Sequence, residues 1–244
     1  MLSTARLIAS KDLRAELRSR VATYQVLPFA VMVLVLFAFA LDPDRNTLRA
    51  AAPGLYWLSV LLTLLITVQR AFAVETDDGA LDALKVTSLS PAGIFLGKAV
   101  ALAAQLLALE VLLAFGTIVL YNARLQTAGI ALVAVTCIAA TCGLAALGTL
   151  YGALSAGLRA RATVLPLLLL PAVAPILIGA TRAFEAGFDV SYISKWDLVR
   201  RCEQVVLGRV DPSEGWPWVL LLAIFAAVYV GLGLVAFGPL LEEG

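Results

Sequence analysis

Long apolar stretches separated by short polar segments dominate the chain. Six of them reach spanning length, because a helix that rises 1.5 Å per residue needs about 20 residues to cross a hydrocarbon core about 30 Å thick. The predicted spans are Val21 to Leu41, Pro53 to Val74, Ala99 to Tyr121, Thr127 to Leu158, Ala162 to Thr181 and Pro217 to Pro239. Since lipid offers the backbone no hydrogen-bond partners, irregular segments should lie between them. The pattern predicts an all-α membrane protein with six transmembrane helices.

A charged segment of 20 residues precedes the first predicted span. Within it Ala9, Leu13 and Leu17 recur every fourth residue, and charged side chains occupy the other faces. This spacing predicts an amphipathic helix that lies at the membrane surface. A solvated helix beside the membrane, with no docking role, fits the same pattern. We therefore expect two parts, an interfacial helix over residues 1–20 and a six-span domain over residues 21–244.

Basic residues are distributed unevenly around the first span. Only Arg45 and Arg49 follow it closely, whereas five basic residues precede it: Arg6, Lys11, Arg14, Arg18 and Arg20. Because basic residues concentrate on the cytoplasmic side, the N-terminus is predicted to be cytoplasmic. Six crossings then return the C-terminus to the cytoplasm. Residues 75–98 become a cytoplasmic loop, and residues 182–216 become an outer segment.

Composition excludes several functional classes. The net charge is +1 and the chain contains no histidine, with 61% hydrophobic residues. A neutral chain offers no basic surface for nucleic acid. The missing histidine removes the usual general base, the commonest metal ligand and the commonest proximal haem ligand. Cys137, Cys142 and Cys202 form no CxxC pair, and the first two are expected to be packing residues. We expect no catalytic site, metal or cofactor in this chain.

The predicted cytoplasmic loop contains a short apolar stripe. Leu81 and Leu84 lie between acidic residues and Pro91, which predicts a short amphipathic helix exposed to the cytosol. The helix could rest on lipid headgroups. The surrounding acids oppose an anionic membrane surface, however, and favour a protein partner.

Gly93, Gly97 and Lys98 superficially resemble a phosphate-binding loop. That motif requires four residues between its glycines and a Ser or Thr after the lysine. Here three residues intervene and Ala99 follows. The sequence therefore predicts no nucleotide site, and ATP energy would have to come from another polypeptide.

Two spans contain residues that are unusual in a membrane helix. Glu110 lies near the middle of the third span, where a carboxylate costs at least about 2.5 kcal/mol. It is either a functional residue or a structural glutamate that is protonated or hydrogen-bonded between helices. Pro171 and Pro175, preceded by Pro166, remove backbone donors from the fifth span. The fifth span should kink or break there, forming a hinge or cavity wall, although proline also occurs in spans for structural reasons.

Two further segments predict packing surfaces. Gly148 and Gly152 lie four residues apart in the fourth span, which allows close approach of another helix from this chain or from a second copy. Outside the membrane, apolar and basic residues alternate at helical spacing between Ser191 and Gly208. This outer pattern predicts an interfacial helix with Trp196 at headgroup depth, or a docking surface for an extracytoplasmic partner.

Several of these motifs together resemble the haem exporter protein B family, a group of permease subunits within the ABC-2 exporter class. The resemblance covers most of residues 8–182. Its motifs are Lys11 to Arg20, Gln69-Arg70-Ala71-Phe72, the loop pattern Glu75, Gly79, Leu81, Leu84, Ser90-Pro91 and Gly97-Lys98, and Leu170 to Gly179 with Pro171 and Pro175. In this family residues 21–244 would form the permease domain. Coupling to an ATPase would use Glu75, Asp78, Gly79, Leu81, Leu84, Ser88 and Pro91.

The resemblance implies a function and a set of partners. Family members belong to the cytochrome c maturation system of the bacterial inner membrane, where the complex exports haem or uses ATP to release a haem-loaded chaperone. The partners would be an ATP-binding cassette subunit, a haem-handling membrane subunit and a small single-span subunit, with two copies of the permease and surrounding lipid. Haem would be held by the other subunits. A permease of the same class that exports a drug, lipid or polysaccharide is the alternative.

Overall fold

A computed structural model describes residues 1–19, 22–40, 45–77, 90–123, 127, 129–156, 161–188 and 212–243. Regular structure within these ranges is helical, and they contain no strand, in agreement with the all-α prediction. The helices are α1 (Leu2–Ser19), the π-helical turn η1 (Ala22–Val26), α2 (Leu27–Ala40), α3 (Arg45–Asp77), α5 (Pro91–Tyr121), α6 (Gly129–Ala156), α7 (Arg161–Gly187), the 3-10 turn η2 (Pro212–Gly215) and α9 (Trp216–Glu243).

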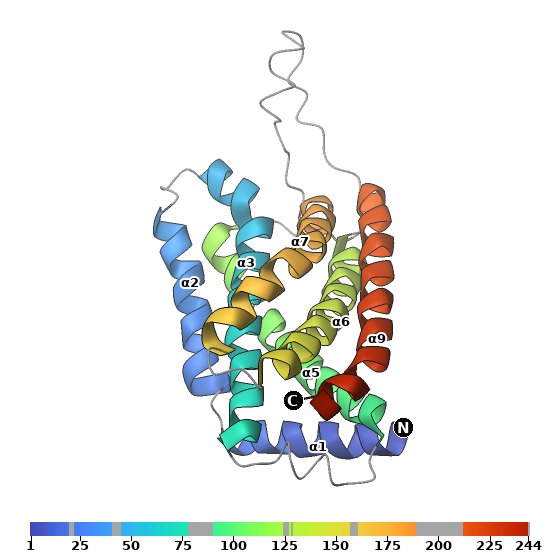
Figure 1. The fold of residues 1–244 in the computed structure, drawn as a ribbon. Coiled ribbons are helices and arrows are strands. Elements are labelled where there is room, and N and C mark those ends of the chain that lie inside the picture. Colours follow the sequence, from blue (N-terminus) through green and yellow to red (C-terminus); the bar gives the residue numbers. More distant parts are fainter. Residues whose placement is uncertain are drawn as a thin grey trace.

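The long helices form an up-and-down bundle (Figure 1). Helices α2, α3, α5, α6, α7 and α9 run in alternating directions, and α7 crosses the bundle obliquely. Helix α1 lies across one end, nearly at right angles to the others, and the C-terminal end of α9 reaches that same end. We call it the α1 end of the bundle.

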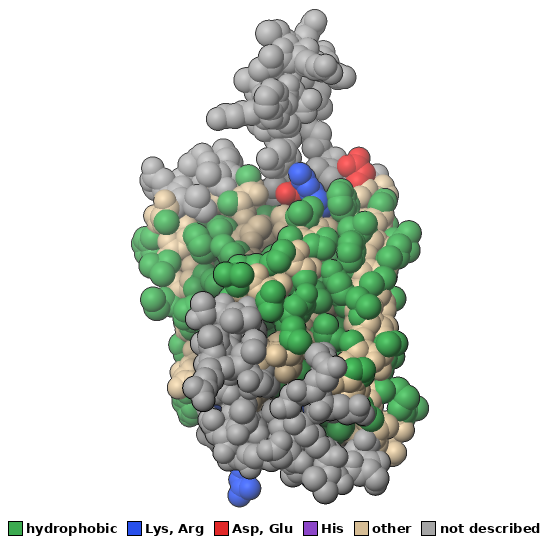
Figure 2. Space-filling view, viewed as in Figure 1, with side chains coloured by type: hydrophobic (Ala, Val, Ile, Leu, Met, Phe, Trp, Pro, Cys, Tyr) green, Lys and Arg blue, Asp and Glu red, His purple; other side chains and the backbone are tan. Residues whose placement is uncertain are grey.

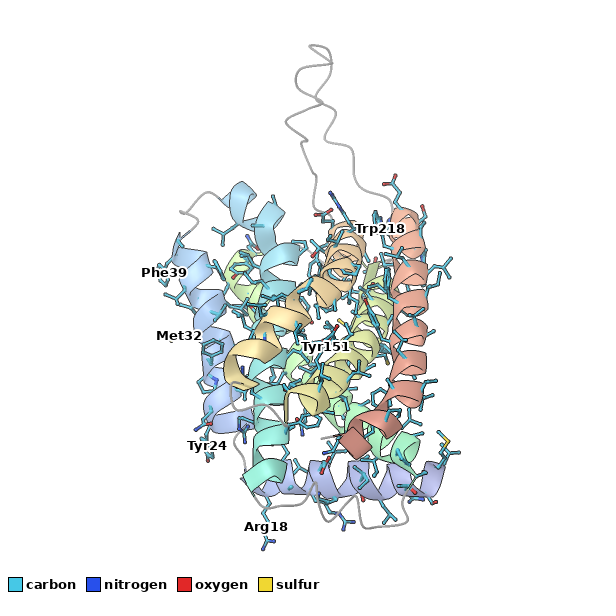
Figure 3. The ribbon with its side chains drawn as sticks, viewed as in Figure 1. Arg18, Tyr24, Met32, Phe39, Tyr151 and Trp218 are labelled. Atoms are coloured by element: carbon cyan, nitrogen blue, oxygen red, sulfur yellow. The ribbon has the colours of Figure 1, made fainter. Side chains whose placement is uncertain are left out.

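The outer surface of the bundle is apolar. Five helical segments are long and apolar enough to cross a membrane: Leu48–Phe72, Pro91–Tyr121, Gly129–Ser155, Pro166–Gly187 and Pro212–Pro239. On the face shown in Figure 2, apolar side chains cover the middle of the bundle and charged side chains lie towards its two ends. Phe39 and Met32 point outward from α2 (Figure 3) and are 82% and 58% exposed. The protein is a multi-pass membrane protein.

The first predicted span differs in the structure. In place of one helix from Val21 to Leu41, η1 is followed by α2, and the apolar helical segment Tyr24–Ala40 is shorter than the other five. Its 17 residues equal the lower limit of about 17 for a spanning helix. The sixth crossing therefore stays a prediction.

Several other helices extend beyond their predicted ends. Helix α3 begins at Arg45 rather than Pro53, and its early turns are tied to the end of α5 because Arg49 Nε donates to the Asn122 carbonyl at 2.9 Å. Helix α7 continues to Gly187 rather than Thr181 because its last turns are buried, including Phe184. Helix α5 starts at Pro91 rather than Ala99, and α9 continues past Pro239 to Glu243.

Helix α1 buries only part of the predicted apolar stripe. Ala9 of the stripe is buried together with Thr4 and Ile8, whereas Leu17 is 77% exposed. At Gly97 of α5, an added Cβ would lie only 2.7 Å from the Ala5 carbonyl oxygen and from Ile8. The absence of a side chain at this glycine lets α1 lie directly against α5. The location of α1 at a membrane surface stays a prediction.

Glycines on α6 make a second close helix contact. An added Cβ at Gly148 would lie 2.8 Å from Val68 of α3, and one at Gly152 would overlap the Phe72 ring. The partner that the sequence left open is therefore α3 of the same chain. The helix predicted between Ser191 and Gly208 lies outside the described residues.

Candidate functional site

The predicted ATPase-docking segment lies in the sequence between α3 and α5, and the end of α3 and the start of α5 both lie at the α1 end of the bundle (Figure 1). Glu75 lies in the last turn of α3, and Pro91 is the first residue of α5. The residues between them that carried the prediction lie outside the described part of the chain: Asp78, Gly79, Leu81, Leu84 and Ser88. The boundaries of the loop are therefore narrower than 75–98, and its internal structure stays a prediction.

Helix α5 begins at a well-defined break. The Ser90 carbonyl accepts hydrogen bonds from the N–H groups of Gly93 and Ile94, at 2.9 and 3.1 Å. Pro91 is placed at the start of the helix, where its missing N–H costs no hydrogen bond. The segment that resembled a phosphate-binding loop is thus the first two turns of a membrane helix.

Glu110 is the centre of a buried polar cluster. Its side chain is 2% exposed, and Thr141 Oγ1 of α6 donates to its Oε1 at 2.5 Å. Tyr56 of α3 donates from its hydroxyl to the Glu110 backbone carbonyl at 3.3 Å and lies 3.6 Å from Cys137 Sγ. We call Tyr56, Glu110, Cys137 and Thr141 the Glu110 cluster. It connects α3, α5 and α6 in the interior of the bundle.

One oxygen of the Glu110 carboxyl group has no hydrogen bond. Oε2 is buried, and no donor among the described residues reaches it. A carboxyl group in this setting can hold two helices together, can accept one further donor, or can exchange a proton when the bundle opens. Within the described ranges no group of three His, Cys, Asp or Glu side chains is placed to hold a metal ion.

Aromatic side chains surround one side of this cluster. The Tyr56 ring stacks on Phe184 of α7 at a centroid distance of 4.8 Å, and Trp57 meets Phe184 edge-on at 5.1 Å. The ring centroid of Phe188 lies 5.3 Å from that of Phe184. These contacts place apolar surface next to the Tyr56 hydroxyl and join the outer part of α7 to α3.

The proline-bearing helix α7 is continuous. It runs for 27 residues and includes Pro166, Pro171 and Pro175, so of the predicted kink or break the break does not occur, and the kink stays a prediction. Tyr229 of α9 donates from its hydroxyl to the Ala172 carbonyl at 2.9 Å, between two of the prolines. A partner helix therefore supplies a hydrogen bond where proline weakens the helical ladder.

Glu110 and the prolines belong to two separate sites. Among the interactions of the described residues, Glu110 bonds to α6 and through its carbonyl to α3, whereas Ala172 bonds to α9. Helix α6 lies between them, because Gly143, two residues after Thr141, packs against Ile176 of α7. The structure thus separates the hinge residues that the sequence grouped together.

The sequence did not reveal the partners of Glu110. Cys137 was expected to be a packing residue, yet its sulfur lies beside the Tyr56 hydroxyl. Thr141 lies 31 residues from Glu110, and no local pattern relates residues at such a separation. The only signal in the sequence was that Thr141 and Glu110 both lie within predicted spans, where a hydroxyl group and a carboxyl group each need a partner.

The comparison with known proteins identifies the family. Residues 3–207 match the family described as CcmB protein. Three curated relatives are named Heme exporter protein B: the Haemophilus influenzae protein is 29% identical, covering 76% of this chain and 83% of its own. The Rhodobacter capsulatus protein is 31% identical, covering 75% and 84%. The Paracoccus denitrificans protein is 33% identical, covering 72% and 80%. This match confirms the resemblance seen in the sequence, and the chain belongs to the CcmB family.

Proposed function

We propose that this chain is the membrane permease subunit of an ABC complex that serves cytochrome c maturation in the bacterial inner membrane. The family match over residues 3–207 carries the proposal, because it includes α1 and every spanning-length helix except the last. The complex would export haem or use ATP to release a haem-loaded chaperone. The three relatives described above are all named for haem export, which favours this role over the export of a drug, lipid or polysaccharide.

ATP binding and hydrolysis would belong to a partner subunit. The segment from Gly93 to Lys98 is occupied by helix packing, because Ile8 of α1 fills the space over Gly97. Lys98 is 6% exposed and pairs with Asp12 of α1. A nucleotide phosphate would have to displace α1 to reach this backbone. These contacts support an ATPase on a separate polypeptide, with Leu81 and Leu84 supplying its docking surface.

The complex would contain further subunits. Because this chain has no histidine, haem ligation would fall to a haem-handling membrane subunit rather than to this chain. A small single-span subunit and a second copy of this chain would complete the assembly. Both termini would face the cytoplasm, since α1 and the C-terminal end of α9 lie at the same end of the bundle (Figure 1).

Movement of the ATPase would reach the outer face through the bundle. Helix α3 ends at Asp77 and helix α5 begins at Pro91, on either side of the docking segment, and α5 carries Glu110. The other carries Tyr56, which binds Glu110. A displacement of the docking segment would therefore act on both sides of the Glu110 cluster.

Complementation tests this proposal. In a bacterium that lacks its own Heme exporter protein B, the chain, expressed with its cognate partner subunits, should restore haem-stained c-type cytochromes. Leu81→Asp with Leu84→Asp should abolish this yield and the co-purification of the ATPase, while Leu81→Met with Leu84→Met should keep both, because methionine preserves apolar volume. Restored drug resistance or surface polysaccharide without cytochrome c would overturn the role. Unchanged ATPase binding in the double aspartate variant would overturn only the docking site.

A further inference from the structure

A second site lies at the α1 end of the bundle, apart from the Glu110 cluster. A partly open cavity of about 220 Å³ lies between α1 and the adjoining parts of α3, α5 and α6. Charged side chains from three helices line it: Lys11, Asp12, Glu16, Arg70 and Lys98. The family assignment and the proposed coupling role leave this cavity without a function.

Two of its cations are held in place by α1. Lys98 Nζ lies 3.8 Å from Asp12 Oδ2 and 5.1 Å from the centre of the Phe72 ring. Arg70 Nη1 lies 3.8 Å from Glu16 Oε1. Both distances exceed the roughly 2.7–2.9 Å of a direct charge-assisted hydrogen bond. These two ion pairs connect α1 to α3 and to α5.

The cavity carries a net positive charge. Among the described residues, three basic and two acidic side chains line it, which is an excess of one positive charge. Lys98 is only 6% exposed, so its charge is weakly screened by solvent. A ligand with a single negative charge would neutralise the site.

The walls of the cavity are also partly apolar. Phe72, Ala101 and Leu102 line it, and Gln105 adds a neutral amide further along α5. Both α3 and α5 continue from here as spanning-length helices. The site thus lies where the spanning part of the bundle meets α1, at a level where phospholipid headgroups would gather if α1 is interfacial.

We propose that this cavity binds the phosphodiester headgroup of an anionic phospholipid. The phosphate oxygens face Arg70 and Lys98, and the acyl chains remain in the membrane beside the bundle because the cavity is too small to enclose them. The bound headgroup joins α1 to α3 and α5. A soluble phosphate ester offers the same chemistry, and the experiment separates these two sources.

Lipid binding to the full-length chain in detergent provides the test. Native mass spectrometry should show one retained phosphatidylglycerol and no matching retention of phosphatidylcholine. Arg70→Gln and Lys98→Gln should each weaken phosphatidylglycerol binding about fivefold, the effect of one basic residue near an anionic surface. Arg18→Gln is the matched control, because Arg18 lies on α1 at the same end of the bundle but points away from it (Figure 3). Glycerol phosphate should compete only at much higher concentration than the lipid.

A variant that removes a negative charge from the cavity separates an effect on lipid binding from an effect on folding. Asp12→Asn removes the carboxylate beside Lys98 and raises the excess charge of the cavity to two. It should tighten phosphatidylglycerol binding about fivefold, although it removes an ion pair that holds α1. Equal binding of phosphatidylcholine, or unchanged binding in Arg70→Gln and Lys98→Gln, would overturn the proposal. If glycerol phosphate bound as tightly as the lipid, the ligand would be a soluble phosphate ester and not a membrane phospholipid. None of these readouts depends on cytochrome c yield.

Discussion

At the scale of single residues, the cost of burying Glu110 is offset mainly by Thr141. Interhelical hydrogen bonds in membranes contribute about 0.6 kcal/mol on average, less than the roughly 2.5 kcal/mol that a central carboxylate costs. Only one carboxyl oxygen is bonded within the described structure. The residue is therefore retained at a net cost, which is the pattern expected of a group with a role in function.

Substitutions of Glu110 should separate its hydrogen bond from its ability to ionise. Glu110→Gln keeps the acceptor for Thr141 and should lower the free energy of unfolding by about 1 kcal/mol. Glu110→Lys places a cation in the same site and should cost about 3 kcal/mol. Thermal unfolding in detergent measures both, and cytochrome c yield should follow the same order. A severe loss of yield in Glu110→Gln, with normal insertion and stability, would show that the charge or the proton is used.

Two glycines of α9 give a matched test of packing. An added Cβ at Gly233 would overlap the ring of Phe95, which is fully buried, whereas Gly231 has open space around it. Gly233→Ala should therefore destabilise the protein by about 1–3 kcal/mol. Gly231→Ala should be neutral or stabilising by up to about 1 kcal/mol, because alanine favours the helix. Equal melting temperatures for the two variants would contradict the close contact between α9 and α5.

At the scale of helices, α6 connects the Glu110 cluster with the proline-bearing helix α7. Its Thr141 binds Glu110, Gly143 faces α7, and Gly148 allows α3 to approach. A helix in contact with several neighbours transmits a displacement only if one neighbour has two arrangements. The prolines of α7 make it the best candidate for that element, because each removes a hydrogen bond from the helical ladder.

Replacing two of the prolines should stiffen α7. Pro171→Ala with Pro175→Ala restores backbone donors on both sides of the Ala172 carbonyl that Tyr229 binds. We expect normal insertion and ATPase binding but a lower cytochrome c yield. The reason is that the coupling free energy transmitted through α7 should fall by about 0.5–2 kcal/mol. Pro166→Ala is the control, since it restores a donor outside this segment. Full yield from the double variant would assign Pro171 and Pro175 a purely structural role.

At the scale of the whole molecule, the apolar surface and the absence of histidine determine what the chain can do alone. Its described exterior presents large apolar side chains on every outward helix, including Phe115, Ile138 and Val235. Such a surface suits lipid and neighbouring subunits.

The isolated chain should show no absorption spectrum of histidine-ligated haem, because it contains no histidine. Titration of haem into the purified protein, followed by visible spectroscopy, checks this. The same preparation should not hydrolyse ATP. Addition of the haem-handling subunit should restore a ligated spectrum. A stoichiometric haem complex of this chain alone, through Tyr, Cys or Met, would contradict the proposed division of labour between subunits.

The amino-acid sequence determined the features that depend on local composition. The positions of the five long apolar helices follow from the length of each apolar run, although α5 starts at Pro91 rather than at the predicted Ala99. Helix ends were less predictable. Arg45 and Gly187 extend their helices because distant residues pack against or bond to the added turns, and such contacts leave no local pattern.

Only the tertiary structure decided which residues meet. The stripe through Leu17 predicted an amphipathic helix, but it did not show that the face with Ile8 and Asp12 meets α5, where Gly97 admits the backbone and Lys98 pairs with Asp12. The pairing of Thr141 with Glu110 likewise depends on the tertiary structure, because the two residues lie on different helices. Hydrophobic periodicity assigns a residue to a membrane helix, since that depends on its neighbours in sequence. Pairing between helices depends on their rotation and depth, which the whole bundle sets at once.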